Sequence, residues 1–598
     1  MVAIDPLNLA VVGNCEVSAL IDARGSLVWM CLPRPDGDPV FSALLTPDLG
    51  AAEQGVFGLD LVDFERGEQR YERNTAIVET RLWDSHGAGI SIIDFCPRFR
   101  THGRMFRPMM LVRMVRPLSG RPLLKIRLRP TADHGARAAH VRAGSHHVHF
   151  DTGELAFRVT SDASISALTR GRPVVVDQPL TFVLGPDETV SEMPAGLSAR
   201  FLEETRTWWQ DWVRSLAIPF EWQEEVIRAA ITLKLCAFED SGAVLAALTT
   251  SIPESPDSGR TWDYRYCWLR DAYFVVQALN RLGATRTMEG YLHFIDNIVA
   301  SVDEVELQPV YSLTGHGGLD ERIVAALPGY LGMGPVRIGN QAAQQVQHDV
   351  YGAIILAVSQ LFFDERLVHP GDAMLFSQLE NVGRRAVQVC DLPDAGPWEL
   401  RGSKHVHTFS AAMSWAGCDR LARIARRLGL AAAADHWRRT ADGLREAIVA
   451  RAWNPQRGAF TATYGGTDLD ASALLLPELG LIDALDPRFV STVEAIGREL
   501  TEGDLLFRYR QSDDFGKPHA AFTVCAFWYV SALAAVGRKE EARERFSRLL
   551  SRRNALGLLS EDIDPDTGQL WGNFPQTYSM VGIISCAVRL SRSWDEAL

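Results

Sequence analysis

Two glutamates lie in loops of a kind that often carries chemistry, because glycine, proline and aromatic residues surround both. Glu399 stands in GPWELRG (396–402), and Glu561 stands in LSEDIDP (559–565), shortly before GNFPQ (572–576). A carboxylic acid that gives a proton to a leaving oxygen and a carboxylate that activates water together cleave glycosidic bonds. For an arbitrary pair of glutamates the ordinary interpretation is two solvated loop acids, so other signals must support this one.

A third segment supplies groups that suit sugar hydroxyls. TWDYRYCWLRD (261–271) is dense in aromatic residues and ends in the adjacent pair Arg270 and Asp271 at a predicted helix start. Neighbouring donors and acceptors can bind two neighbouring hydroxyls, and aromatic faces pack against the C–H surfaces of a pyranose ring. The alternative for the pair alone is a capping aspartate beside a surface arginine.

The elements that must position these segments are helices, because the hydrophobic pattern beyond residue 220 is helical. Apolar side chains between residues 288 and 299 fall at i, i+3, i+4, i+7, i+10 and i+11. The pattern predicts about twelve helices that begin near residues 222, 270, 285, 341, 372, 408, 430, 469, 488, 518, 539 and 576. Twelve helices of alternating direction can close as six hairpins into an (α/α)6 barrel.

In such a barrel every connection from an odd-numbered to an even-numbered helix emerges at the same end. The long connections predicted here are all of this type: 302–340, 393–407, 502–517 and 553–575. Both glutamate segments lie within them. Residues far apart in the sequence are therefore expected to meet at one mouth of the barrel.

The first 190 or so residues follow a period of two instead. Leu124 to Arg129 alternates strictly between apolar and basic side chains, as a strand with one buried face does. We therefore predict an α+β multidomain protein with three parts: an N-terminal antiparallel β-sandwich domain (1–195), a linker helix (196–219) and a C-terminal (α/α)6-barrel catalytic domain (220–598).

Composition limits the partners and the compartment. The chain of 598 residues is 47% hydrophobic and 23% charged, as in a globular protein, and its net charge of −13 does not favour nucleic acid. The sequence contains no apolar run of about 18 residues, so we predict no membrane span. Nine cysteines without a CxxC pair are typical of buried thiols in a reducing compartment, so a cytoplasmic enzyme is expected. A homo-oligomer is compatible with the sequence.

Beyond these patterns, ALTTSIPESPDSGRTWDYRYCWLRDAYF (247–274) resembles glycoside hydrolase family 15, which comprises glucoamylases and their bacterial relatives. The opening LAVVGNCEVSALIDARGSLVWMCLPRPDGDPVFSALL (9–45) resembles the N-terminal β-sandwich of the bacterial members. Blocks similar to the family also lie near Gln347, Arg508, Trp528 and Pro575, so the resemblance covers nearly the whole chain. It implies an inverting, exo-acting hydrolase, without metal or cofactor, that releases glucose from the non-reducing end of a short α-glucan or disaccharide.

The resemblance also implies roles for single residues, motif by motif. Glu399 would be the general acid and Glu561 the general base that deprotonates water. The others would bind sugar: Arg270 and Asp271 the hydroxyls of the terminal glucose, Tyr264 and Trp268 the first subsite, Trp398 and Arg401 the next subsite, and Arg508 a further hydroxyl. Burial against Trp398 is expected to keep the acid protonated, and solvent or donors to keep the base ionised. Room for a water places the carboxyl groups of an inverting pair roughly 6.5–9.5 Å apart.

Two segments depart from the family pattern. After GNFPQ the chain continues TYSM (577–580), where Met580 closes a stretch that lacks the expected histidine, and after FRYR the usual Gly-Glu element is replaced by KPHAA (517–521). The linkage therefore stays open among glucoamylase (α-1,4), isomaltose or dextran glucohydrolase (α-1,6) and trehalase (α,α-1,1). The alternatives are a glycoside phosphorylase on the same architecture and a non-catalytic sugar-binding protein. Glu561 counts against the first, and the two glutamates together count against the second.

Overall fold

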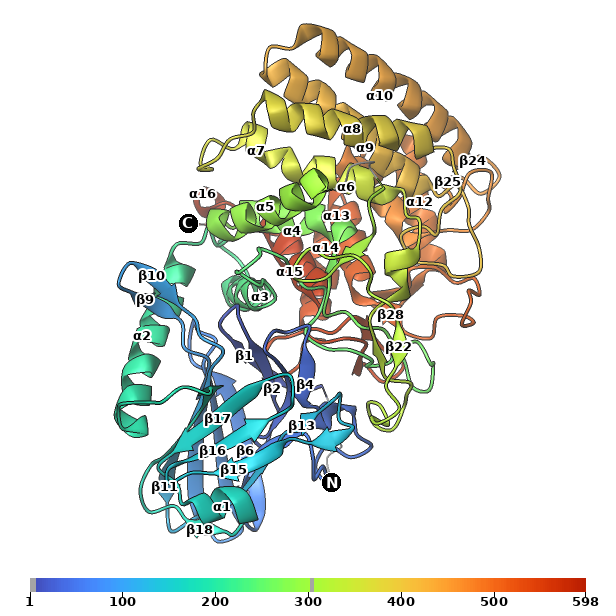
Figure 1. The fold of residues 1–598 in the computed structure, drawn as a ribbon. Coiled ribbons are helices and arrows are strands. Elements are labelled where there is room, and N and C mark those ends of the chain that lie inside the picture. The colour runs from blue at the N-terminus through green and yellow to red at the C-terminus, as the bar shows by residue number, and fades with distance from the viewer. Residues whose placement is uncertain (1–6, 302–305, 598) are drawn as a thin grey trace.

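A computed structural model of the protein describes residues 7–301 and 306–597. The N-terminal part forms a β-sandwich, and the helices of the later part stand on one end of it (Figure 1). Residues 1–6 of the predicted sandwich domain, residues 302–305 of the predicted connection 302–340 and residue 598 lie outside the described residues.

The sandwich contains two antiparallel sheets. One sheet has the order β1-β2-β3-β5-β12-β18, with β4 paired to β3: β1 (Ala10–Gly13), β2 (Ser18–Ile21), β3 (Leu27–Leu32), β4 (Asp38–Phe41), β5 (Val56–Leu61), β12 (Leu123–Arg129), β18 (Val174–Val175). The other has the order β15-β16-β17-β19-β11-β8-β7-β6: β6 (Phe64–Tyr71), β7 (Val78–Asp84), β8 (Gly89–Phe95), β11 (Leu111–Ser119), β15 (His140–Ala143), β16 (His147–Asp151), β17 (Ala156–Ser161), β19 (Leu180–Pro186).

The twofold period of the sequence explains which faces pack together. In β12 the apolar Leu124, Ile126 and Leu128 are buried, whereas Lys125 between them is exposed. The inward side chains of both sheets share one apolar core, in which Phe57 of β5 meets Phe182 of β19 edge to face. The apolar residues of the predicted alternation therefore face the core, and the residues between them face the solvent or its edge.

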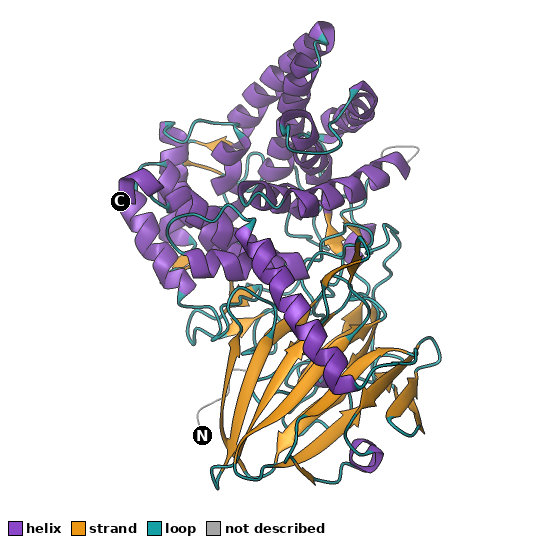
Figure 2. Ribbon diagram, turned by 90° about the vertical axis from the view of Figure 1, so that its left-hand side faces the viewer, coloured by secondary structure: helices purple, strands orange, loops and turns teal. Residues whose placement is uncertain are grey.

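Smaller elements complete the N-terminal part. They are the hairpins β9 (Phe99–Thr101) with β10 (Arg104–Phe106) and β13 (Thr131–Ala132) with β14 (Arg137–Ala138), and the short helix α1 (Ile165–Arg170). Helix α2 (Pro194–Arg214) then crosses the outside of the sandwich on its way to the helical region (Figure 2). It packs on β9 and β19, and its Trp209 is fully buried.

The helical region has an inner and an outer ring. The inner ring consists of α4 (Leu269–Arg281), α6 (Asp349–Val358), α9 (Thr408–Arg427), the 3-10 turn η3 (Ala471–Leu475) with α11 (Leu476–Leu479), α13 (Thr523–Ala535) and α15 (Thr577–Leu590). The outer ring consists of α3 (Gln223–Leu235), α5 (Thr285–Ser301), α8 (Ala373–Val389), α10 (Ala431–Ala452), α12 (Pro487–Glu499) and α14 (Lys539–Leu550). Short helices α7 (Gln360–Phe363) and α16 (Trp594–Ala597) lie outside this alternation. Each inner element contacts the next around the ring, which confirms the predicted sandwich-plus-(α/α)6 fold class.

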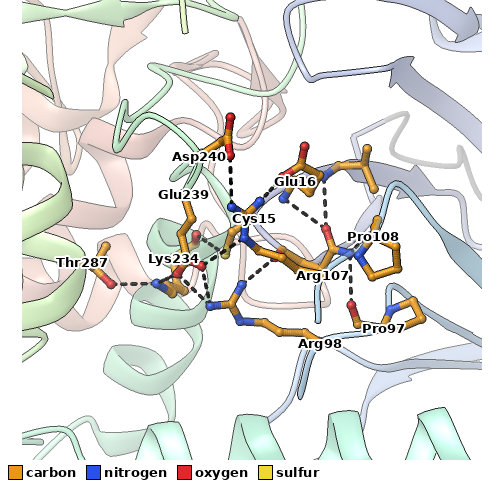
Figure 3. Close-up of polar contacts among 12 residues, drawn as sticks. Cys15, Glu16, Pro97, Arg98, Arg107, Pro108, Lys234, Glu239, Asp240 and Thr287 are labelled. Atoms are coloured by element: carbon orange, nitrogen blue, oxygen red, sulfur yellow. Dashed lines mark hydrogen bonds and ion pairs between the residues drawn. The ribbon is translucent and has the colours of Figure 1, made fainter. Parts of the chain in front are cut away.

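Buried charges join the sandwich to the helices (Figure 3). Glu239, just beyond α3, accepts from Arg98 of the sandwich at both carboxylate oxygens, with Nη2 2.7 Å from Oε1 and 2.8 Å from Oε2. Lys234 of α3 donates to the same carboxylate and to Thr287 Oγ1 of α5 at 2.8 Å. Burial alone would raise the pKa of Glu239, but the charges of Lys234 and Arg98 lower it to about 2.

Candidate active site

The connections that enter the inner helices meet at one mouth of the barrel, as the helix count predicts. They form a pocket lined by eight of the nine predicted site residues: Tyr264, Trp268, Arg270, Asp271, Trp398, Glu399, Arg401 and Arg508. The ninth, Glu561, lies directly behind Tyr264, whose hydroxyl donates to Glu561 Oε1 at 2.7 Å. The fold thus brings together residues separated by up to 297 positions in the sequence.

Glu399 precedes α9 and is held in an uncommon backbone conformation. Its φ of 61° lies in the left-handed region, which costs energy for a residue with a side chain. Gln345 Nε2 donates to its carbonyl oxygen at 3.0 Å. Trp268 Nε1 donates to Oε1 at 2.6 Å and Arg270 Nη2 donates to the same oxygen at 2.9 Å. Two donors therefore fix the position of this one carboxylate oxygen.

Glu561 precedes α15 and is fully buried at 0% exposure. It stands next to the hairpin of β29 (Asp562–Ile563) and β30 (Leu570–Trp571), where Gly572 has a φ of 72° and a Cβ there would lie 2.6 Å from Glu561 Cβ. Burial, and then the charge of Glu254, raise the pKa of Glu561 to about 8, although the Tyr264 hydrogen bond and Arg508 oppose this.

Tyr264 and Trp268 connect the two glutamates. Their rings pack edge to face with centroids 5.1 Å apart. Tyr264 donates to Glu561 and Trp268 donates to Glu399, so one aromatic pair carries a hydrogen bond to each glutamate. The two carboxyl groups are therefore held at the same pocket, on different sides of this pair.

Arg270 at the start of α4 is fixed from behind the pocket. Besides Glu399, its guanidinium donates to Gln347 Oε1 at 3.0 Å and lies 3.8 Å from Asp349 Oδ2. Asp349 at the start of α6 is fully buried, and neither of its carboxylate oxygens has a hydrogen-bond partner among the described residues. Burial raises the pKa of the neighbouring Asp271 to about 7.

The remaining sugar-site candidates each have a protein partner. Trp398 Nε1 donates to Asp470 Oδ2 at 2.7 Å, and Arg508 donates to Glu254. Arg401 donates to Glu321 Oε2 at 2.8 Å and lies over the ring of Trp262 with Cζ 4.6 Å from its centroid. These bonds leave the aromatic face of Trp398 and the guanidinium groups in place at the pocket wall.

The surroundings of Glu561 differ from one expectation from the sequence. We expected burial against Trp398 to keep Glu399 protonated and solvent or donors to keep Glu561 ionised. Glu399 accepts from the neutral indole of Trp268 and from the charged Arg270, whereas Glu561 is fully buried and its pKa is raised. The reason is that the burial of Glu561 beside the β29–β30 hairpin outweighs the opposing effects of the Tyr264 hydrogen bond and Arg508.

Sequence reasoning missed Glu254, Asp349 and Asp562, which surround the predicted residues. Each lies inside or next to a block that resembles the family, and a scan of those blocks for further acids would have found them. Carboxylate oxygens of Glu254, Glu561 and Asp562 lie within 4.8 Å of one another and form the one metal-type grouping among the described residues. Arg508 pairs with Glu254, and Arg260 Nη1 lies 3.8 Å from Glu254 Oε2, so guanidinium groups already supply positive charge there.

No helix among residues 7–301 and 306–597 is long and apolar enough to cross a membrane.

Known proteins match this chain over nearly its whole length. The family model "Glycosyl hydrolases family 15" matches residues 222–588, and the model "Trehalase-like, N-terminal" matches residues 3–161. A trehalase of Mycolicibacterium smegmatis is 34% identical over 98% of this chain and 91% of that protein, and a trehalase of Thermoplasma volcanium is 29% identical over 97% and 93%. A solved bacterial glucoamylase complexed with acarbose shares the fold, with a TM-score of 0.69 and 13% identity over 97% of this chain and 93% of that one. The chain therefore belongs to family 15 of the glycosyl hydrolases, as its motifs predicted, and is an α-glucoside hydrolase.

Proposed function

We propose that the enzyme hydrolyses trehalose, in which an α,α-1,1 bond joins two glucose residues, by a single displacement with inversion. Among the three linkages left open by the sequence, this one is supported by relatives named trehalase that align with almost all of the chain. The observation that carries the mechanism is the Tyr264–Trp268 pair, which hydrogen-bonds to one glutamate from each ring. A glucose ring bound against this pair would have a carboxyl group within reach on two sides.

Glu399 is the general acid and Glu561 the general base in this proposal. A bound glucose offers hydroxyls that compete with Glu399 for Arg270 and displaces water from the acid, which leaves Glu399 free to give a proton to the leaving oxygen. Glu561 becomes ionised as the pH rises through its pKa of about 8, and it then removes a proton from the attacking water. Water attacks the anomeric carbon as the oxygen of the second glucose leaves with the proton from Glu399.

The other pocket residues bind the two sugars. Arg270 and Asp271, at the start of α4, take neighbouring hydroxyls of the first glucose, with Tyr264 and Trp268 against its ring. Trp398 and Arg401 contact the second glucose, and Arg508 donates to a further hydroxyl. A pocket built in this way takes the non-reducing end of its substrate.

We also propose that the enzyme works in the cytoplasm. All nine cysteines are free and buried, which suits a compartment that keeps thiols reduced.

NMR of the first products tests the function. An inverting enzyme releases one β-glucose and one α-glucose from each trehalose, whereas a retaining enzyme releases α-glucose alone. Maltose, isomaltose, kojibiose and maltotriose in parallel test the linkage, and added phosphate tests for glucose 1-phosphate. Glu399→Gln and Glu561→Gln should each lower kcat by about 10³-fold. Faster cleavage of an α-1,4 or α-1,6 substrate, or α-glucose alone from trehalose, would overturn the proposal.

A further inference from the structure

A tight turn stands at the mouth of the pocket, in the connection that leads to β28 (Ala521–Phe522) and α13. Asp513 and Gly516 exchange backbone hydrogen bonds of 3.1 Å in both directions, and Asp513 Oδ1 accepts from Phe515 N at 2.8 Å. Asp513, Asp514 and Phe515 all line the pocket. We call residues 513–516 the cap. Its next residue, Lys517, opens the segment that departs from the family pattern.

One side of the cap is bound to the wall that carries Trp262. Arg260 Nη1 donates to Asp513 Oδ2 at 2.8 Å, and its Nη2 donates to Asp513 Oδ1 and, at 2.8 Å, to the carbonyl oxygen of Gly516. Tyr509 also donates to Asp513. Arg260 and Asp513 are both buried, so this bidentate pair is shielded from competing water.

The other side of the cap is bound to the wall that carries the acid. Arg401, two residues after Glu399, donates its backbone N–H to Asp514 Oδ2 at 2.6 Å. The Arg401 side chain is fixed in turn by Glu321, which also accepts from Arg337 Nη1 at 2.7 Å. The cap therefore bridges two walls of the pocket that come from distant parts of the chain.

Phe515 is the apolar end of the cap. Its ring meets Trp262 edge to face at 5.1 Å, and the guanidinium groups of Arg260 and Arg401 lie 5.6 and 5.7 Å from its centroid. The side chain stays 37% exposed, which is unusual for a phenylalanine held by three neighbours. Phe515 and Arg401 line the same pocket, so a sugar beside Arg401 has the Phe515 ring as a neighbour.

We propose that the cap restricts the enzyme to disaccharides, because Asp514 and Phe515 occupy the space that a third glucose would need beyond the second subsite. This inference rests on the proposed function, in which Arg401 contacts the second glucose. Trehalose ends at that glucose and fits below the cap. A substrate longer by one glucose would collide with the Phe515 ring and the Asp514 carboxylate. The cap is thus a specificity element and takes no part in bond cleavage.

Trehalose and 4-O-α-glucosyl-trehalose test the cap, because the second sugar keeps the α,α-1,1 bond and adds one glucose beyond it. The wild-type enzyme should have a kcat/KM for the trisaccharide at least about tenfold below that for trehalose. Phe515→Ala should reduce the difference in kcat/KM between trehalose and the trisaccharide by about tenfold. Asp514→Ala removes only the hydrogen bond from the Arg401 backbone and should reduce this difference less. Phe363→Ala is the matched control, since Phe363 of α7 is 45% exposed and lies outside the pocket lining.

Equal rates on both sugars in the wild-type enzyme, or a ratio that neither cap variant changes, would overturn the cap. An enzyme that leaves trehalose intact would overturn the proposed function instead. In that case the same ratio is measured with the disaccharide that the enzyme does cleave and its homologue one glucose longer, so the cap is still tested.

Discussion

Two clusters of buried charge in this molecule differ in how well their carboxylates are paired. At the boundary between sandwich and helices, Glu239 accepts from Arg98 at both oxygens and from Lys234 as well. Beside the pocket, the carboxyl groups of Glu254, Glu561 and Asp562 crowd together, and Asp562 Oδ2 is buried without a hydrogen-bond partner among the described residues.

The pKa values follow the pairing. The pKa of Glu239 is lowered to about 2, whereas that of Glu561 is raised to about 8. A cluster whose charges are matched holds two parts of the protein together, and it does so in one charge state over the whole neutral range. A cluster with an excess of carboxyl groups is less stable, but one member of it can exchange a proton near neutral pH. The contrast fits a structural use of charge at Glu239 and the catalytic use that we propose for Glu561.

The largest expected effects come from substituting one glutamate in each cluster. Glu561→Gln should lower kcat on trehalose by about 10³-fold, because the base is lost, with little loss of stability. Glu239→Gln should lower the free energy of unfolding by about 3 kcal/mol, because Arg98 and Lys234 lose their carboxylate, while kcat of the folded enzyme stays near the wild-type value. Steady-state kinetics and urea unfolding measure both. A loss of kcat in Glu239→Gln as large as in Glu561→Gln would break the comparison.

A smaller effect is expected at Asp349, a buried acid that faces Arg270 at ion-pair distance without a hydrogen bond to it. Asp349 is fully buried 3.8 Å from Arg270 Nη1, and its oxygens accept no hydrogen bond from the described residues. Asp349→Asn should therefore lower kcat/KM by about tenfold through misplacement of Arg270, without loss of stability.

The matched control is Asp94→Asn in the sandwich. Asp94 is equally buried but accepts from Arg113 Nε at 2.7 Å and from Nη2 at 3.2 Å. This control should lose stability and keep kcat/KM. The reverse pattern, a destabilised Asp349→Asn with unchanged kinetics, would show that Asp349 belongs with the paired charges.

Most of the fold was predictable because its signals are local. Helices α5, α8 and α9 begin within one residue of the predicted starts, where a polar residue precedes an amphipathic run. Helix α13 was predicted at 518 and begins at Thr523, because Ala521 and Phe522 pair as β28 with β29, about forty residues away. A strand of two residues that depends on a distant partner is too short to show a hydrophobic period in its own sequence.

The site divides in the same way. Glu399 and Glu561 were predictable from their turn-rich motifs, and the barrel brings both to one mouth. Their surroundings were not, since the donor to Glu399 is Trp268, 131 residues earlier, and the acid beside Glu561 is Glu254. The expectation that solvent or donors keep Glu561 ionised differs from the raised pKa of this group, and the catalytic roles of the two glutamates stay predictions.

The smallest expected effect, a shift in the pH profile, tests the excess of carboxyl groups most directly. In the proposed mechanism Glu561 acts as base only in its ionised form, so kcat/KM should rise as the pH increases through its pKa of about 8. Because the charge of Glu254 raises this pKa and the hydrogen bond from Tyr264 lowers it, Glu254→Gln should move this rising limb of the pH profile to lower pH and Tyr264→Phe should move it to higher pH. Each shift should be about one unit or less.

Glu380→Gln is the control for these shifts, since Glu380 accepts from Trp437 Nε1 at 2.8 Å much as Glu254 accepts from Trp262 Nε1 at 2.9 Å, but outside the pocket. Its profile should match that of the wild type. Shifts of the same sign in Glu254→Gln and Tyr264→Phe would contradict the assignment of the limb to Glu561. Opposite shifts would mean that neighbouring charges and donors, and not solvent access alone, set the pKa of Glu561 near neutral pH. Glu239 differs, because its paired cations keep its pKa at about 2.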